Sequence, residues 1–331
     1  MAINNAALFK AAVARAVELL RAGQLVALPT ETVYGLAANA WDADAVRRIF
    51  EVKGRPSHNP IIVHVAGVEL ARRCVTGWSP LAVKMAAAFW PGPLTMVLPR
   101  AKEIPDVVTA GGNTVGVRWP SHPFIQAVIR ECGFPLAAPS ANRSNRISPT
   151  KAEHVRKDLD GLIPLIVDGG PSQVGIESTV FDLTSSPPRV LRPGMIHADS
   201  LQAAMGEGAV GGGAEKGATV RRSPGLMPKH YAPKAKLVLL SWQDEDDLAA
   251  KVAVYGIKPD KIHVLAHHVI SMRPGFGRVS NIPQDAKAWA RVLYAELHRC
   301  DEAGAQLIVV ETPPPGEEWR GIADRLTRAS H

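Results

Sequence analysis

Hydrophobic positions along this chain switch repeatedly between two spacings. Apolar residues recur every three or four positions over residues 8–20, which predicts an amphipathic helix, and the compact apolar run at residues 25–29 predicts a buried strand. A helix capped by Asp42 and reaching Lys53, a strand over residues 61–65 and a helix over residues 81–89 continue the pattern. Such alternation is typical of an α/β domain.

The alternation extends to about residue 200. Short strands are predicted within residues 95–98, 114–120, 135–142, 165–170, 178–183 and 189–194, and the segment 123–132 is predicted to be a helix that ends at Gly133. In "SPTKAEHVRKDL" (residues 148–159) a further helix is predicted, with Pro149 near its first position and Thr150 and Glu153 spaced as a capping box.

A second pattern follows a change in composition. Residues 206–217, "GEGAVGGGAEKG", lack apolar periodicity and are typical of a flexible linker. Strands are then predicted at residues 236–241, 261–266 and 305–311, with helices from residue 244, over 285–299 and after residue 320. We therefore expect a catalytic domain over residues 1–200, a linker over 201–235, and a small doubly wound domain over 236–331.

Composition narrows the class of protein. Hydrophobic residues make up 46% of the 331 positions and charged residues 21%, which is ordinary for a soluble globular protein. The net charge of +7 favours anionic partners such as nucleotides or nucleic acid. Three scattered cysteines argue against a disulfide framework, and the sequence shows neither a secretory leader nor a membrane-length apolar run. We expect a cytoplasmic protein without a membrane partner.

Several common active-site motifs are missing from the sequence. It contains no GxxxxGK[ST] loop, no GxGxxG after a strand, no HExxH and no GxSxG. Candidate chemistry instead lies in stiff turns. "PTETVYG" (residues 29–35) and "KGRPSHNP" (residues 53–60) follow predicted elements, and the second holds Lys53 and Arg55 among Gly54, Pro56 and Pro60. Both cations can meet phosphate, although solvated surface charges or a simple capped turn remain alternatives.

Two further residues suggest a small-molecule site. His64 lies in the apolar run "IIVHV", where it is either a ligand contact or a core histidine. Arg118 ends a predicted strand, where it either clamps a carboxylate or pairs with a neighbouring acid. "APSANRS" (residues 138–144), "IEST" (residues 176–179) and Arg192 add hydroxyls, amides and charge. Together they predict a basic, hydroxyl-lined cleft for a small anion.

In combination these motifs resemble one known family. "LPTETVYGLAANA", "KGRPSHNPIIVHV", "WPGPLTMVL", "VGVRWPSHP", "APSANRSNRISPTKAEHV", "GIESTVFDL" and "LRPG" occur in the order found in the Sua5/YrdC/YciO family, and "SPGLMPKHYAPKA" is similar to the linker of its two-domain, Sua5-type members. The resemblance implies an α/β fold with a YrdC-like twisted mixed sheet and surrounding helices, followed by a small Rossmann-like, doubly wound C-terminal domain.

The resemblance also implies an activity. Enzymes of this type are nucleotidyltransferases that condense L-threonine, bicarbonate and ATP into threonylcarbamoyl-adenylate and pyrophosphate, with Mg²⁺ accompanying ATP. The product feeds the N6-threonylcarbamoyladenosine modification of tRNAs that read ANN codons, so tRNA and a threonylcarbamoyl-transfer complex are the downstream partners. No covalent enzyme intermediate is required, which agrees with the missing nucleophile motifs.

Site residues follow from the resemblance position by position. Lys53 and Arg55 would neutralise charge during catalysis, and no residue of the chain is expected as a metal ligand. The threonine site would comprise Thr30, His64, Arg118, Ala138 and Ser178. The ATP site would comprise Lys53, Ser57, Thr114, Ser140, Asn142, Ser148, Arg192 and, from the linker, Tyr231. Trp119 departs from the smaller residue that many relatives carry before the proline.

Two alternatives belong to other functional classes. An RNA-binding module of the YrdC/YciO type would use the positive charge without turning over ATP, although aromatic residues for base stacking make up only 5% of the chain. A carbamoyl-transfer enzyme of the hydrogenase-maturation type uses a related domain. Such proteins also carry acylphosphatase-like and zinc-finger segments, and this sequence has neither.

Overall fold

The computed structural model describes residues 1–206, 210–212, 223–224, 230–268 and 275–330. It contains two compact units, Met1–Ser144 with Ser148–Leu226, and Asn145–Ile147 with Met227–His331. Asn145–Ile147 belongs to the second unit, where the backbone N–H of Ala232 donates to the carbonyl of Asn145. Most of the predicted linker, at residues 207–209, 213–222 and 225–229, lies outside the described residues.

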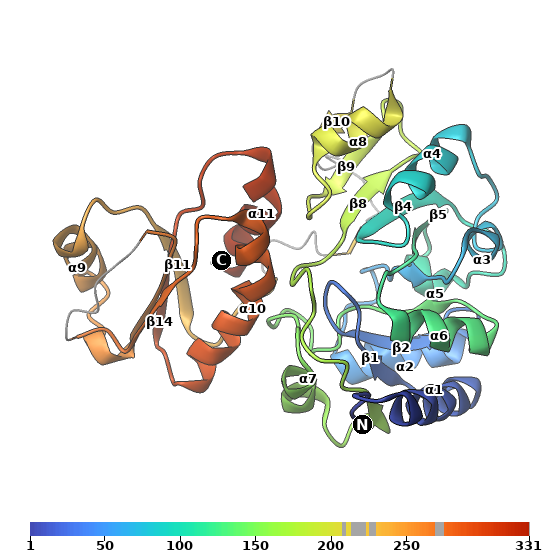
Figure 1. Ribbon diagram of the computed structural model, residues 1–331, viewed down its shortest axis with the longest axis horizontal. Helices are drawn as coiled ribbons and strands as arrows, with labels where there is room; N and C mark the ends of the chain where they lie inside the picture. Colours follow the sequence, from blue (N-terminus) through green and yellow to red (C-terminus); the bar gives the residue numbers. More distant parts are fainter. Residues whose placement is uncertain (207–209, 213–222, 225–229, 269–274, 331) are drawn as a thin grey trace. The chain divides into compact units, whose positions relative to one another are not determined.

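The first unit is built on a mixed sheet whose strand order is β10-β9-β8-β4-β5-β3-β6-β2-β1-β7 (Figure 1). The strands are β1 (Val26–Leu28), β2 (Gly35–Asn39), β3 (Val63–His64), β4 (Leu94–Pro99), β5 (Thr114–Arg118), β6 (Leu136–Ala137), β7 (Leu165–Ile166), β8 (Thr179–Asp182), β9 (Arg189–Arg192) and β10 (Gly211–Gly212). The helices are α1 (Ala6–Arg21), α2 (Ala43–Lys53), α3 (Val68–Arg72), α4 (Pro80–Phe89), α5 (Asp106–Thr109), α6 (Pro123–Cys132), α7 (Ala152–Leu159) and α8 (Ala198–Met205).

The two faces of this sheet have different surroundings. Successive strand residues point to opposite faces. One face carries Val63, Val117 and Met96, cross-strand partners that pack into a large apolar core with α2, α4 and α7. The other face is covered at one end by α1 and α6, which lie beside each other in Figure 1. Beyond these helices, that second face presents His64, Thr95, Gly116 and Arg118.

Local sequence determines where α2 ends, and so where Lys53 lies. The side chain of Asp42 accepts hydrogen bonds from the N–H groups of Asp44 and Ala45, which satisfies donors at the start of the helix. Gly54 adopts a left-handed conformation with φ of 59°, which ends the helix at Lys53. The expected helix over these residues is confirmed.

The expected start of α7 is wrong. The helix begins at Ala152, and its N-cap residue Lys151 makes no side-chain capping bond. Instead the N–H of Thr150 donates to Nδ1 of His154 at 3.2 Å, and the carbonyl of Pro149 accepts the N–H of Tyr34 at 2.8 Å. Residues 148–150 therefore lie outside the helix, where Tyr34 and His154 bind the backbone groups of Pro149 and Thr150 in place of a capping box.

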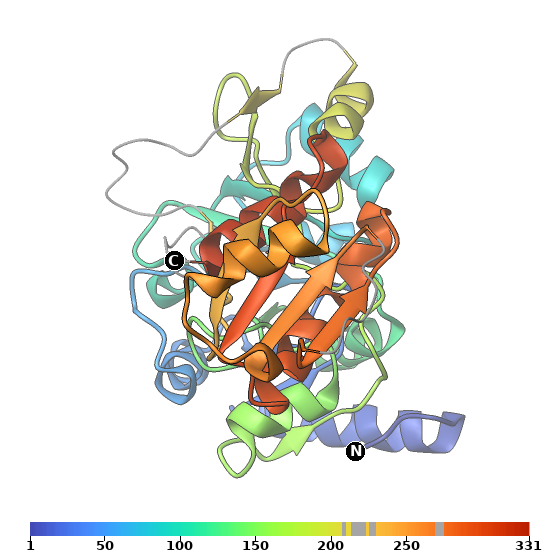
Figure 2. The same cartoon turned by 90° about the vertical axis from the view of Figure 1, so that its left-hand side faces the viewer.

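The second unit holds a parallel sheet in the order β11-β14-β12-β13. Its elements are β11 (Lys236–Leu240), α9 (Glu245–Ala253), η1 (Pro259–Lys261), β12 (Ile262–Ala266), β13 (Arg278–Asn281), α10 (Ala286–Glu302), β14 (Leu307–Glu311), η2 (Glu317–Trp319) and α11 (Arg320–Ala329). Figure 1 shows α9 on one side of this sheet and α10 and α11 on the other, and Figure 2 views the strands nearly face on with α9 in front. Apart from β13, these strands and helices match the expected doubly wound pattern.

Two findings concern the chain as a whole. Within the described residues, no helix combines the length and the apolar character needed to cross a bilayer. Cys74, Cys132 and Cys300 are buried and free.

Candidate active site

Arg118 lies at the centre of the polar region on the second face of the first unit. Its Nη2 donates to Oε1 of Glu31 at 2.6 Å, its Nη1 to Oγ1 of Thr32 at 2.9 Å, and its Nε to the carbonyl of Gly92 at 3.3 Å. Both charged side chains are buried, with 4% and 6% of their surface exposed. The carboxylate partner that the sequence left open as an alternative is therefore present, and it is Glu31.

His64 lies directly beside Arg118, because the two residues are paired in the parallel register of β3 and β5. Its side chain is buried, and its Nδ1 has no hydrogen-bond partner. Burial, reinforced by the charge of Arg118, lowers the pKa of His64 to about 3, so the ring is neutral at physiological pH. A satisfied core histidine would have both ring nitrogens paired, and this one does not.

The "PTET" turn supplies the two side chains, those of Glu31 and Thr32, that accept hydrogen bonds from Arg118. Oγ1 of Thr30 donates to the carbonyl of Val33 at 2.6 Å and accepts the N–H of Thr32 at 3.2 Å, so this hydroxyl shapes the turn. The carbonyl of Glu31 accepts the N–H of Val174 at 2.6 Å, which fixes the turn to a distant segment. Glu31 Oε2 is buried without a hydrogen-bond partner. The site thus contains two buried polar atoms without a hydrogen-bond partner, Glu31 Oε2 and His64 Nδ1, next to one guanidinium.

Lys53 and Arg55 are bound to backbone carbonyls. Nζ of Lys53 donates to the carbonyl of Ser140 at 2.6 Å and to the carbonyl of Asn142. Arg55 donates from Nε to the carbonyl of Asn59 at 3.1 Å and from Nη2 to that of Pro60 at 2.7 Å. Burial lowers the pKa of Lys53 well below its ordinary value, and the charge of Arg55 adds to this effect. Lys53 therefore joins α2 to the "SAN" segment, and Arg55 holds its own loop in shape.

The remaining hydroxyl residues form a second group near β8 and β9. Oγ of Ser178 lies 2.7 Å from Oγ1 of Thr95, and Nη2 of Arg192 donates to the Ser178 carbonyl at 2.9 Å and to its Oγ at 3.1 Å. Oγ of Ser148 donates to Oε1 of Glu177 at 2.5 Å. Arg192, Ser178 and Ser148 are all buried.

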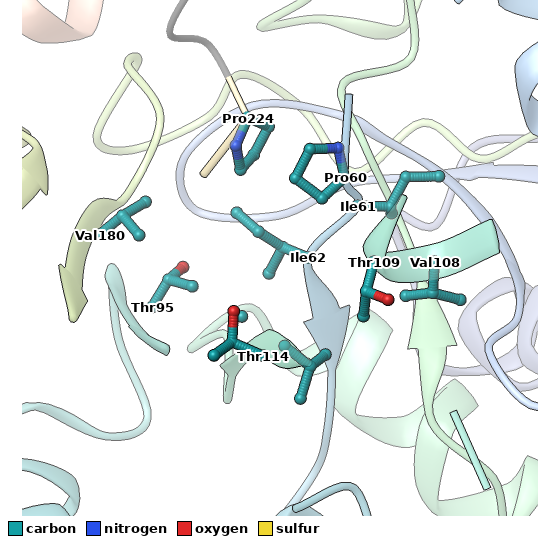
Figure 3. Close-up of a pocket in the computed structure, with 11 residues that line it drawn as sticks. Pro60, Ile61, Ile62, Thr95, Val108, Thr109, Thr114, Val180 and Pro224 are labelled. Atoms are coloured by element: carbon teal, nitrogen blue, oxygen red, sulfur yellow. The ribbon is translucent and has the colours of Figure 1, made fainter. Parts of the chain in front are cut away.

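A small pocket opens beside this group in the first unit, with about 290 Å³ of empty space, part of it open to solvent. Thr114 and Thr95 contribute hydroxyl groups to its wall, and Ile62 also lines it (Figure 3). Gly116 keeps the pocket free, because a Cβ there would lie 3.1 Å from Cγ2 of Thr95. The other lining residues are Pro60, Ile61, Val108, Thr109, Val115, Val180 and Pro224.

The structure brings some predicted site residues together and leaves others apart. His64 and Arg118 are neighbours, as are Ser178 and Arg192, and Lys53 contacts Ser140 and Asn142. The N–H of Ala138 is used by the carbonyl of Ile62, so any ligand contact from its backbone would come from its carbonyl. Ser57 is exposed on its loop.

Tyr231 and Trp119 lie in other surroundings. Tyr231 belongs to the second unit, where it is buried and stacks on Tyr294 with ring centroids 5.8 Å apart. The guanidinium of Arg325 lies 5.4 Å from the centroid of the Tyr231 ring. Its expected contact with ATP stays a prediction. Trp119 packs against the large apolar core of the first unit.

Glu31, Thr32, Thr95 and Glu177 are the residues that were not singled out from the sequence. Glu31 and Thr32 belong to the "PTET" motif, from which only Thr30 was chosen, so the motif itself was the available signal. Thr95 lies in a predicted strand, and no motif in the sequence identifies it as a site residue. Its contact with Ser178 joins residues 83 positions apart.

The carboxylates around the site offer little for a metal ion. Glu31 pairs with Arg118, Glu177 accepts Ser148, and Asp182 accepts the Thr184 hydroxyl. Mg²⁺ prefers several free oxygen ligands. In the described residues, the group of side chains close enough to hold an ion is in the second unit. The first unit therefore fits Mg²⁺ that arrives bound to phosphates better than Mg²⁺ held by the protein.

Comparison with known proteins matches both units. The family model of the Sua5, YciO and YrdC proteins, whose description reads "Telomere recombination", matches residues 18–194. A second model, described as the C-terminal domain of threonylcarbamoyl-AMP synthase, matches residues 196–331. The chain is 39% identical to the threonylcarbamoyl-AMP synthase of Pyrococcus abyssi, over 94% of this chain and 92% of that protein. It is 48% identical to the threonylcarbamoyl-AMP synthase of Bacillus subtilis, over 96% of this chain and 92% of that protein.

Solved structures agree with these matches. A variant of P. abyssi Sua5, in which a histidine and a tyrosine are replaced by alanine, covers 100% of this chain and 96% of its own, at 35% identity and a TM-score of 0.89. P. abyssi Sua5 complexed with L-threonine covers 96% of this chain and 94% of its own, at 37% identity and a TM-score of 0.86.

Proposed function

This chain belongs to the family of Sua5, YciO and YrdC proteins, and from that membership we infer that it is a threonylcarbamoyl-AMP synthase. The reaction joins L-threonine, bicarbonate and ATP to give threonylcarbamoyl-AMP and pyrophosphate. It requires a site that binds a small zwitterion and a site that binds a triphosphate. The amine must reach the carbon of bicarbonate, and an oxygen of the resulting carbamate must then reach the α-phosphorus.

The buried pair of Arg118 and Glu31 is the observation that carries the amino-acid site. A zwitterionic substrate presents a carboxylate and an ammonium on one carbon, and a guanidinium beside a carboxylate is complementary to both. Arg118 binds the substrate carboxylate, displacing or sharing the bond at 2.6 Å that now goes to Glu31. The unpaired Oε2 of Glu31 accepts from the ammonium.

The hydroxyl of the amino acid meets His64. Because the ring is neutral and buried, its unpaired Nδ1 is a hydrogen-bond acceptor for an alcohol. A substrate without a hydroxyl would leave this nitrogen unsatisfied, which is an effective basis for rejecting it. Thr30 and Thr32 act by holding the turn that carries Glu31.

The chemistry proceeds in two steps without a covalent enzyme intermediate. The ammonium first loses a proton, for which Glu31 is the nearest carboxylate in this arrangement. The amine nitrogen then bonds to the bicarbonate carbon and water leaves, which produces a carbamate. A carbamate oxygen next bonds to the α-phosphorus of ATP, the bond from that phosphorus to the bridging oxygen breaks, and pyrophosphate leaves.

Catalysis of the second step relies on positioning and charge. Lys53 and Arg55 supply the positive charge for the triphosphate, and Ser140, Asn142 and Ser148 line its path. The rest of the nucleotide would enter at the pocket beside Thr114 and Thr95, which has to widen to admit it. Mg²⁺, carried by ATP, would neutralise phosphate charge. The product passes to tRNA through a threonylcarbamoyl-transfer complex, and we expect this to occur in the cytoplasm.

Pyrophosphate release tests the proposed function. Purified protein with ATP, L-threonine, bicarbonate and Mg²⁺ should release pyrophosphate, and omission of threonine or of bicarbonate should abolish the release. Equal release without threonine would refute the proposal. Tight, salt-dependent RNA binding without any release would support the RNA-binding alternative in its place.

A further inference from the structure

Two histidines and a glutamate meet at the carboxyl ends of two adjacent strands in the second unit. His267 and His268 directly follow β12, and Glu311 is the last residue of β14, its parallel neighbour. Their ligand atoms all lie within 4.8 Å of one another. In open parallel sheets, the carboxyl ends of the strands are where ligands bind. This group cannot be recognised from the sequence, because Glu311 is 44 positions from His267.

The carboxylate is already oriented toward both imidazoles. Oε2 of Glu311 accepts the backbone N–H groups of His267 at 2.7 Å and His268 at 3.1 Å. The same oxygen lies 3.3 Å from Nδ1 of His267, and Oε1 contacts Nδ1 of His268. Side chains that bind a metal are usually oriented by hydrogen bonds of this kind from surrounding groups.

His267 is held rigidly and yet has an unused nitrogen. Its side chain is only 5% exposed and packs between Trp289 and Trp319, with ring centroids 6.1 and 6.2 Å away. Its Nδ1 has no hydrogen-bond partner. The side chain of His268 is 68% exposed, so the group is accessible from solvent.

We propose that His267, His268 and Glu311 form a binding site for a divalent d-block cation of the Zn²⁺ class. Two imidazole nitrogens and a carboxylate are a ligand set that suits Zn²⁺, Co²⁺ or Ni²⁺, whereas Mg²⁺ prefers oxygen ligands only. Three protein ligands leave a coordination position for water or another ligand. The bound ion would cross-link the ends of β12 and β14. This site is independent of the adenylation chemistry of the first unit.

Metal titration of the full, tag-free chain tests the proposal. After treatment with a chelator, the protein is titrated with Co²⁺, followed by visible absorption, and with Zn²⁺, followed by calorimetry. We expect one high-affinity ion per chain, quenching of tryptophan fluorescence by Co²⁺ through Trp289 and Trp319, and a higher melting temperature in saturating Zn²⁺. Mg²⁺ should not compete.

Three variants locate the ion. H268A removes an exposed ligand, and E311Q keeps a carbonyl oxygen for the two N–H groups while it removes the charge, so both should stay folded by circular dichroism. Each should weaken Zn²⁺ binding by about tenfold or more. H58A, which removes an exposed histidine of the first unit, should bind Zn²⁺ as the unsubstituted protein does. No stoichiometric binding, or equal affinity in folded H268A and E311Q, would overturn the proposal.

Discussion

Glu31 Oε2 and His64 Nδ1 are buried polar atoms without a hydrogen-bond partner, and both belong to residues that neighbour Arg118. Burying a polar atom without a partner costs about 1–3 kcal/mol, so such atoms are few in folded proteins and call for a reason. We propose that a substrate ammonium and a substrate hydroxyl complete the two bonds. On this proposal, the two unpaired atoms destabilise the empty site and favour a substrate that carries both an ammonium and a hydroxyl.

Replacing Glu31 by glutamine should affect threonine far more than ATP. The amide keeps one acceptor for Arg118 but loses the charge that attracts the ammonium, and a hydrogen bond to a charged group contributes about 1.5–3 kcal/mol. We expect the KM for threonine to rise by about tenfold or more, with a smaller change for ATP, in steady-state pyrophosphate assays. E153Q, an exposed carboxylate on α7, is the control. Equal changes for both substrates in E31Q would contradict this role.

His64 should make the stability of the protein depend on acid pH. Its pKa is about 3 in the folded chain and about 6.5 when unfolded, so between these values the unfolded state binds the extra proton. Stability is therefore fully retained above pH ~6.5 and falls as the pH drops toward 3, by about 2 kcal/mol between pH ~7 and ~5. Urea unfolding should show this loss, and H64Q should reduce it. An unchanged pH profile in H64Q would show that other groups are responsible.

At the scale of elements, α2 carries Lys53 to the "SAN" segment that follows β6. The helix begins at an Asp42 cap and ends at a left-handed Gly54, so both signals are local and can be found from sequence. The hydrogen-bond partners of Lys53 cannot be found from local sequence, because these carbonyl groups lie 87 and 89 positions further along the chain. The strand order that brings them together depends on long-range pairing.

K53M should impair catalysis more than D42A, which removes the N-cap of the same helix. Methionine fits the buried volume but leaves the Ser140 and Asn142 carbonyls without their donor and removes charge from the triphosphate site. Pyrophosphate release should fall by about a hundredfold, in line with the loss of a preorganised donor. D42A is the matched control: it should lower the free energy of unfolding by about 1 kcal/mol and leave the KM for ATP unchanged. Similar activity losses in both variants would assign Lys53 a purely structural role.

The pocket beside β5 depends on the missing side chain of Gly116. An added Cβ would lie 3.1 Å from Thr95 and 3.5 Å from Ile62, so G116A narrows the pocket and G116V fills it. Valine suits a strand, and the fold should persist. We expect the KM for ATP to rise in the order glycine, alanine, valine, by about tenfold for valine if one or two kcal/mol of binding is lost. An unchanged KM in G116V would exclude this pocket from the nucleotide site.

For the whole molecule, sequence patterns predicted the two-part α/β organisation and most elements, because helix periodicity, caps and glycine stops are local. They failed where tertiary contacts override local signals: His154 and Tyr34 bind the backbone of residues 149–150, and Asn145–Ile147 joins the second unit. They left open that Arg118 pairs with an acid but could not identify Glu31 as that acid, since a motif identifies residues but not their partners 87 positions away.

The adenylation chemistry itself is tested most directly by identifying its product. The full chain is incubated with ATP, L-threonine, Mg²⁺ and isotope-labelled bicarbonate, and the mixture is analysed by mass spectrometry. We predict threonylcarbamoyl-AMP that carries the label in its carbamoyl carbon, formed in equal amount with pyrophosphate. Pyrophosphate without this adduct, or an adduct that lacks the label, would contradict the proposed reaction.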